Sequence, residues 1–176
     1  GFKQKRTLNW VIGLGLLVLV LVFNFTGYLL PWDQLSYWAI TVGTSLLSYI
    51  PLIGQALSLA VLGGREVGQA ALSNFYALHV AGLPAVLIII LTYHFWRVRK
   101  DGGISQPLPE EGEKVARVTT IPHLVRRELA VGAVVIAAVL LWSMFTPAPL
   151  GSIANPLHSP NPAKAAWYLG GIQELL

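Results

Sequence analysis

Apolar residues fill three long stretches of this chain, and polar residues gather between them. The stretches run over residues 10–30, 72–96 and 129–145. A helix needs about 20 apolar residues to cross a hydrocarbon layer about 30 Å thick. The first two stretches have that length, and the third is slightly shorter but contains no charged residue. The pattern predicts an all-α integral membrane protein with transmembrane helices at residues 10–32, 70–97 and 128–146.

The remaining segments differ from one another in composition. Residues 33–69 are rich in Leu, Ile, Tyr and Trp and are broken by Pro51 and Gly54, which favours two short helices lying at the membrane interface. Residues 98–127 are polar and form a connector, and the proline-rich residues 147–164 form an extended loop. The apolar residues 165–176 are typical of the start of a further helix.

The overall composition excludes a soluble domain. Hydrophobic residues make up 55% of the chain, charged residues only 11%, and the mean hydropathy is +0.62. Soluble proteins carry about 25% charged residues, so this chain cannot cover a water-facing surface. Because the chain has no cysteine, disulfides, thiolate metal sites and cysteine nucleophiles are excluded as well.

The distribution of charge predicts the orientation in the membrane. Ten of the twelve Lys and Arg residues lie before the first apolar stretch or between the second and third. Cytoplasmic loops carry such an excess of basic residues, so residues 1–9 form a cytoplasmic lead-in and residues 98–127 a cytoplasmic connector. Residues 33–69 and 147–164 then lie on the outer face. The net charge of +4 is therefore an orientation signal, and we expect no nucleic-acid partner.

Two histidines lie within the second apolar stretch. An ionisable side chain inside a membrane helix is costly and points to function. His79 and His94 are 15 residues apart, so their imidazoles lie about 22 Å apart in depth and about 60° apart around a regular helix. Pro84 between them can bend that helix. Two imidazoles at different depths suit two stacked haem irons, although from spacing alone each histidine could equally bond a neighbouring helix.

Several longer motifs resemble one known family. They are residues 27–34 (GYLLPWDQ), 36–39, 50–54 (IPLIG), 67–84 with His79, 94–105, 121–123 and 155–168. Together they resemble cytochrome b of quinol–cytochrome c or plastocyanin oxidoreductases, especially the b6-type and bacterial split forms. The 14 residues between the histidines match the b6-type spacing, whereas the mitochondrial type has 13. The resemblance covers the family's third to fifth transmembrane helices, the outer loop and the start of the sixth.

The resemblance implies a cytochrome b-type helical bundle that binds two b-type haems and quinol or quinone. His79 would ligate the outer, low-potential haem and His94 the inner, high-potential one. The second axial ligands would come from the family's first two helices, which have no counterpart here. The outer quinol-oxidation pocket would be lined by Tyr28, Pro31, Trp32 and Tyr168. Arg99 and Lys100 would face the inner quinone-reduction site or the haem propionates.

Two positions depart from the family pattern. Asn74 replaces an arginine that is associated with a haem propionate, so a cation such as Arg65 would have to take its place. The outer loop reads Ala165-Ala166-Trp167-Tyr168 where the family has Pro-Glu-Trp-Tyr. Glu174 follows about two helical turns later and could point to the same side. An apolar setting raises a carboxyl pKa, which suits a proton acceptor, so Glu174 is a candidate replacement for the missing glutamate.

The resemblance implies a subunit of a quinol oxidoreductase in an energy-transducing membrane, such as the bacterial cytoplasmic membrane. Its expected partners are a chain or segment carrying the first two cytochrome b helices, a Rieske iron–sulfur protein, and a c-type cytochrome or similar acceptor, in a dimeric complex. The chain begins with glycine, so we expect it to be a piece of something larger. Two other classes stay open: a cytochrome b membrane anchor of a dehydrogenase, and a non-redox membrane packing subunit.

Overall fold

The computed structural model describes residues 6–103, 119–161, 164 and 166–174. Within them the chain forms α-helices and short 3-10 or π turns, and its only strand-like pairing is a single bridge between Asp33 and Ile153. The helices are α1 (Thr7–Tyr28), α2 (Gln34–Ser48), α3 (Gly54–Leu62), α4 (Gln69–Ala77), α5 (Leu83–Lys100), α6 (Arg126–Phe145) and α7 (Gly170–Gln173). π turns lie at Leu78–Gly82 and Thr120–Val125, and a 3-10 turn at Trp167–Leu169.

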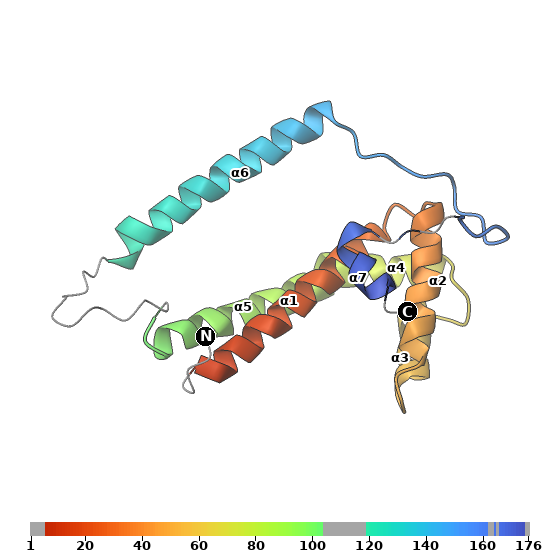
Figure 1. Cartoon of the computed structure of the whole chain (residues 1–176), viewed down its shortest axis with the longest axis horizontal. Helices are drawn as coiled ribbons and strands as arrows, with labels where there is room; N and C mark the ends of the chain where they lie inside the picture. Colours follow the sequence, from red (N-terminus) through yellow and green to blue (C-terminus); the bar gives the residue numbers. More distant parts are fainter. Residues whose placement is uncertain (1–5, 104–118, 162–163, 165, 175–176) are drawn as a thin grey trace. The chain divides into compact units, whose positions relative to one another are not determined.

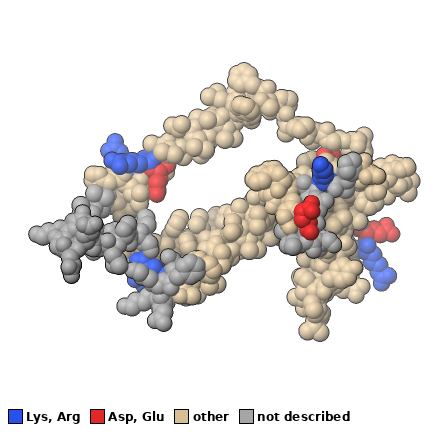
Figure 2. Space-filling view, viewed as in Figure 1, with Lys and Arg blue, Asp and Glu red and all other residues tan. Residues whose placement is uncertain are grey.

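Three helical segments of the described chain are long and apolar enough to cross a membrane. They are Thr7–Tyr28, Gln69–Lys100 and Thr120–Phe145. The second contains α4, a π turn and α5 in one continuous helical run. Figure 2 shows Lys, Arg, Asp and Glu near helix ends and none over the middle of α1 and α5. The predicted class, an all-helical multi-pass membrane protein with three spanning helices, is confirmed.

The chain divides into two compact units, Gly1–Ile104 with Leu150–Leu176, and Ser105–Pro149. In the second unit, α6 follows the π turn Thr120–Val125, and none of its residues is buried. Because α6 is apolar on all sides, its surface suits lipid or neighbouring helices rather than water.

In the first unit, α1 and α5 pack along each other and α2 and α3 form a helical hairpin (Figure 1). The turn of that hairpin requires glycine at position 54, because a Cβ there would lie 2.3 Å from the Leu47 carbonyl oxygen. α3 also packs on α4. One buried cluster joins the end of α1 to α2, α3 and α4: Leu29, Ile40, Leu62, Ala71 and Phe75. The hairpin is thereby fixed to the junction of α1 and α4.

The C-terminus of α3 is closed by Asn74 of α4. Gly63 adopts φ +67°, a left-handed conformation that ends many helices. The Asn74 amide nitrogen donates to the Ala60 and Val61 carbonyl oxygens, at 3.2 Å each. These are carbonyls that a helix end leaves without intrahelical partners. Asn74, which stands where the resembled family has an arginine, therefore has a structural role here. Arg65 lies exposed in the loop before α4.

Candidate functional site

The two histidines of the second spanning segment both face α1. A Cβ added at Gly27 would lie 2.8 Å from Cε1 of His79, and one added at Gly13 would lie 3.4 Å from Cε1 of His94. Fourteen α-helical steps fall about 40° short of four full turns and rise about 21 Å. Gly13 and Gly27 therefore form one stripe on α1, and the imidazoles meet it at two levels.

A π turn brings His79 to the side of its helix that His94 occupies. The turn covers Leu78–Gly82, and the Leu83 N–H donates to the Leu78 carbonyl oxygen, five residues back. A π turn accommodates one more residue than an α turn. The 15 residue steps between the histidines therefore rotate the helix by about as much as 14 regular α-helical steps. The two histidines are then about 40° apart around their helix, the same angle that separates Gly13 and Gly27 around α1. Pro84 follows at once, and its ring would clash with the carbonyl four residues back in a regular α-helix.

Thr26 lies against one ring nitrogen of His79. The Thr26 hydroxyl is 3.0 Å from the Phe23 carbonyl oxygen, to which it can donate its one hydrogen, and 2.9 Å from Nδ1 of His79. In the tautomer with a hydrogen on Nδ1, the Thr26 oxygen accepts that hydrogen. Nε2 is left with a lone pair, the state in which a histidine binds metal through one nitrogen while a second partner orients the ring through the other.

A cavity of about 490 Å³ adjoins His79. Phe23 contacts the imidazole edge-on, with ring centroids 4.8 Å apart, and the Tyr168 hydroxyl lies 3.4 Å from the Asn24 carbonyl oxygen. This volume is within the range of small-molecule and cofactor sites. The wall is mainly apolar with a few polar groups: Val20, Phe23, Asn24, Gly27, Tyr28, His79, Leu87 and Tyr168.

Tyr28 and Tyr168, two of the residues expected at a quinol pocket, both line this cavity. Partial burial raises the pKa of the Tyr168 phenol, which keeps it neutral and able to donate a hydrogen bond. Trp32 instead packs against the buried cluster under α2 and contacts Tyr37 edge-on, and Pro31 is exposed. Glu174 is exposed in the turn after α7.

Four polar atoms near the start of α1 and along the last part of α5 are buried without partners among the described residues. They are Asn9 Oδ1, His94 Nδ1, Arg97 Nε and Asp101 Oδ2. Nearly all buried polar groups in proteins are hydrogen-bonded, so unmet donors and acceptors around one histidine are what a polar ligand would require. Asn9 lies on α1, His94 and Arg97 lie on α5, and Asp101 directly follows α5.

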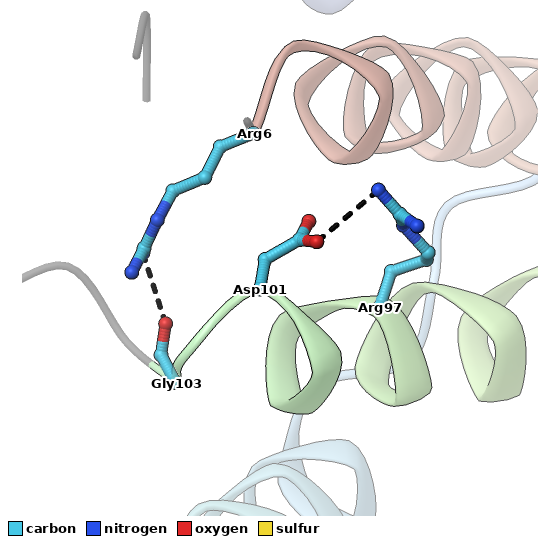
Figure 3. A network of polar contacts seen from close by, with 4 residues as sticks. All are labelled: Arg6, Arg97, Asp101 and Gly103. Atoms are coloured by element: carbon cyan, nitrogen blue, oxygen red, sulfur yellow. Dashed lines mark hydrogen bonds and ion pairs between the residues drawn. The ribbon is translucent and has the colours of Figure 1, made fainter. Parts of the chain in front are cut away.

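An ion pair and a long-range hydrogen bond organise this end of the two helices (Figure 3). Arg97 Nη2 lies 3.1 Å from Asp101 Oδ1, and Arg6 Nη1 donates to the Gly103 carbonyl oxygen at 2.9 Å. Arg99 and Lys100 are exposed, and the Lys100 ammonium lies 4.9 Å from the Trp96 ring centroid. Sequence reasoning treated Arg97 only as an orientation charge, although it is the arginine nearest in sequence to His94.

The chain is similar in sequence to known proteins. A family model described as Cytochrome b(N-terminal)/b6/petB matches residues 1–153. The chain is 47% identical over 108 residues to a "Cytochrome b6" of Synechococcus sp. (strain JA-3-3Ab), and 50% identical over 107 residues to a "Cytochrome b6" of Heliomicrobium gestii. Each match covers 61% of this chain and 50% of the relative. The chain thus matches about half the length of these curated relatives.

Proposed function

We propose, because the chain belongs to the cytochrome b(N-terminal)/b6/petB family, that it is a transmembrane electron-transfer subunit of a quinol oxidoreductase. His79 and His94 would each hold a b-type haem through the imidazole. When bound, a b-type haem supplies reversible one-electron chemistry at its iron. The chain's own part is to hold the two ligands at two depths of the membrane and to shape the sites at either end.

The observation that carries the proposal is the matched pair of contacts on α1, His79 against Gly27 and His94 against Gly13. A ligand role needs imidazoles whose rings are fixed and whose ligating nitrogen is open. Thr26 suits both needs for His79, because it contacts Nδ1 and, in the tautomer with a hydrogen on that nitrogen, leaves Nε2 open.

The cavity beside His79 is the proposed quinol-oxidation site. Its apolar wall suits a quinone ring and tail, while Tyr28 and Tyr168 bring hydroxyl groups that can bond a quinol oxygen. The distribution of basic residues places this end outside. Glu174 remains the proposed acceptor for a quinol proton. Carrying that proton to the outer face would couple quinol oxidation to charge movement across the membrane.

The opposite end, around His94, is the proposed inner site. Arg97 carries a buried Nε without a partner among the described residues, and Arg99 and Lys100 add positive charge next to it. Cations so placed stabilise anionic groups, such as carboxylate side arms of a cofactor or a reduced quinone. This end would hold the group that receives an electron from the outer site.

The rest of the assembly is part of the same proposal. A second ligand for each haem would come from the cytochrome b helices that this chain does not match. A Rieske iron–sulfur protein takes the other electron from the quinol and passes it to a c-type cytochrome or a similar acceptor. The complex is dimeric and lies in an energy-transducing membrane, with a bacterial cytoplasmic membrane as the proposed site.

A redox titration of the purified intact complex, followed by visible spectroscopy, tests this function. We expect two b-type components, with His79→Gln removing the lower-potential one and His94→Gln the higher. His123→Gln is the matched control, because His123 is exposed outside the proposed sites, and it should leave both components unchanged. A wild-type complex without a b-type alpha band would contradict the proposal. A haem-containing complex without an iron–sulfur partner would instead favour the dehydrogenase anchor.

A further inference from the structure

A loop distant in sequence is fixed to the first turn of α2. Asp33 pairs with Ile153 in an isolated antiparallel bridge. The Gln34 N–H donates to the Ser152 carbonyl oxygen at 2.8 Å. Both partners belong to the same compact unit of the chain. The loop would otherwise have to find hydrogen-bond partners for its backbone in water.

Asp33 joins three segments through one carboxylate. Its Oδ1 accepts from the Ser36 N–H at 2.9 Å and caps α2, and its Oδ2 accepts from the Gly151 N–H at 2.9 Å. The Ser36 hydroxyl lies 2.7 Å from Asp33 Oδ1 and 3.0 Å from the carbonyl oxygen of Tyr28, at the end of α1. A Cβ at Gly151 would lie 2.8 Å from Oδ2. The approach of the loop to the carboxylate therefore depends on glycine.

Gln34 and Trp38 bind the next part of the loop through its backbone. Gln34 Oε1 accepts from the Asn155 N–H at 2.5 Å, and its Nε2 donates to the Asn155 carbonyl oxygen at 3.4 Å and to the His158 carbonyl oxygen. The Trp38 indole N–H donates to the same His158 carbonyl oxygen at 3.1 Å. We call the contacts of Asp33, Gln34 and Trp38 with residues 151–158 the α2 clasp.

The α2 clasp meets the wall of the His79 cavity at Tyr28. Tyr28 lines the cavity, and its carbonyl oxygen lies 3.0 Å from the hydroxyl of Ser36, which also bonds Asp33. Tyr168 follows His158 by ten residues in the sequence and also lines the cavity, with its hydroxyl 3.4 Å from the Asn24 carbonyl oxygen on α1. The loop that precedes Tyr168 in the sequence is thus fixed, at residues 151–158, to the helix that begins just after Tyr28.

We propose that Asp33 and Gln34 are positioning residues for the His79 cavity, which hold residues 151–158 of the loop against the start of α2, next to Tyr28. They touch no ligand and act through the loop. For its kinetic consequence the inference rests on the proposed quinol oxidation at this cavity. A helix cap and loop anchor with no other task would alter stability alone, whereas a positioning device also alters how tightly the cavity holds a quinol.

Hydrogen exchange in the purified complex tests the clasp without using activity. Asp33→Asn keeps the size of the side chain but loses the charge and one acceptor oxygen. We expect exchange in the peptide spanning residues 150–158 to become about tenfold faster, the effect of losing a hydrogen bond to a charged acceptor. Gln55→Ala on α3 is the control, because Gln55 is exposed and outside the clasp. Unchanged exchange in Asp33→Asn would overturn the clasp itself.

Steady-state kinetics on the same variants test the positioning. We expect Asp33→Asn and Gln34→Leu to raise the KM for quinol about three- to tenfold, with kcat within about twofold of wild type. Without the clasp, the loop would have to be ordered when quinol binds, and that cost weakens binding. Gln55→Ala should match the wild type. Faster exchange with an unchanged KM would overturn the positioning role and leave a structural anchor. A wild-type complex that does not oxidise quinol would refute the proposed function, while the exchange result would still report on the clasp.

A reversible covalent substitute separates positioning from folding. The Gln34–Ser152 bond makes Asp33 and Ile153 a non-hydrogen-bonded pair, whose Cα atoms lie about 4.5 Å apart, within disulfide range. The chain has no other cysteine. Asp33→Cys alone should raise the KM as above. The double variant Asp33→Cys, Ile153→Cys should have the wild-type KM when its disulfide is formed. Reducing the disulfide should raise the KM again. A KM that ignores the state of this bond would contradict the proposal.

Discussion

The imidazole of His79 lies directly against the backbone of Gly27, so closely that a Cβ at position 27 would lie 2.8 Å from Cε1. Real Cβ atoms do not tolerate this approach, and the ring is further held by Thr26 and by Phe23. A Cβ at position 27 would therefore push the His79 ring out of these contacts. Small residues permit close helix contact in membranes, and here the contact is between a glycine and a candidate metal ligand.

Gly27→Ala should displace His79 and disturb its haem. An overpacked contact costs about 1–3 kcal/mol, and the ring cannot turn without losing its bond to Thr26. We expect a redox titration of the intact complex to show a lowered content or a shifted midpoint of the lower-potential b component only. Gly13→Ala is the matched control, since its Cβ would meet His94 at 3.4 Å, an ordinary contact. Equal effects of the two substitutions would refute this reading.

Thr26→Val should raise the midpoint potential of the haem bound to His79. The change removes the acceptor of the Nδ1 hydrogen while keeping the shape of a side chain that is 2% exposed. A bonded Nδ1–H makes an imidazole a stronger donor to its metal, which favours the oxidised iron. We expect a rise of about 20–60 mV, where 59 mV is a tenfold change for one electron.

Thr26→Ser keeps the hydroxyl and serves as the control for the valine variant. Its potential should stay within a few millivolts of the wild type. If the valine and serine variants shift together, the cause is lost packing of the Thr26 methyl group, and the hydrogen bond to His79 is not what sets the potential.

The π turn predicts where the second spanning helix tolerates a deletion. Removing Ala81 from the turn Leu78–Gly82 leaves 14 α-helical steps between the histidines, which keeps both on the α1 side. Removing Ile89 from the regular helix α5 rotates His94 about 100° away from Gly13. We expect the first deletion to retain both b components in the visible spectrum and the second to lose one. The opposite order would show that the π turn does not set the histidine register.

Asp33 predicts a pH dependence of the α2 clasp. Partial burial pushes the pKa of this carboxyl up, but hydrogen bonds from Ser36, Gly151 and Leu35 outweigh it and hold the pKa below 3.8. A carboxyl whose pKa is lower when folded contributes stability above its unfolded pKa and loses it as the pH falls through the folded value. Exchange of residues 150–158 should therefore accelerate below about pH 4 in the wild type beyond the intrinsic pH effect. Asp33→Asn should show no such acceleration.

The three spanning helices were predictable because the length of an apolar run is a local property of the sequence. The face on which His79 lies was not, since a π turn leaves no mark on the hydrophobic pattern and shifts the helical phase by one residue. The sequence did indicate a histidine pair and a bend near Pro84. It could not indicate that Thr26 orients one ring, because that contact joins residues 53 positions apart.

The α2 clasp shows the same limit more clearly. Its hydrogen bonds connect residues 118–124 positions apart, and most of them end on loop backbone, which any residue type supplies. Asn74 is a related case, because no sequence motif predicts its hydrogen bonds to the carbonyl oxygens of α3. Cytochrome b membership and the helical class were predictable and are confirmed. The ligand, pocket and proton-acceptor roles of the site residues stay predictions.

An experimental map of the intact complex that resolves metal positions tests the central claim most directly. We predict two irons, one bonded to Nε2 of His79 and one to Nε2 of His94, about 21 Å apart along the helix axis, with Gly27 and Gly13 against the respective rings. An iron bonded through Nδ1 of His79, or no metal within bonding distance of either histidine, would contradict the account.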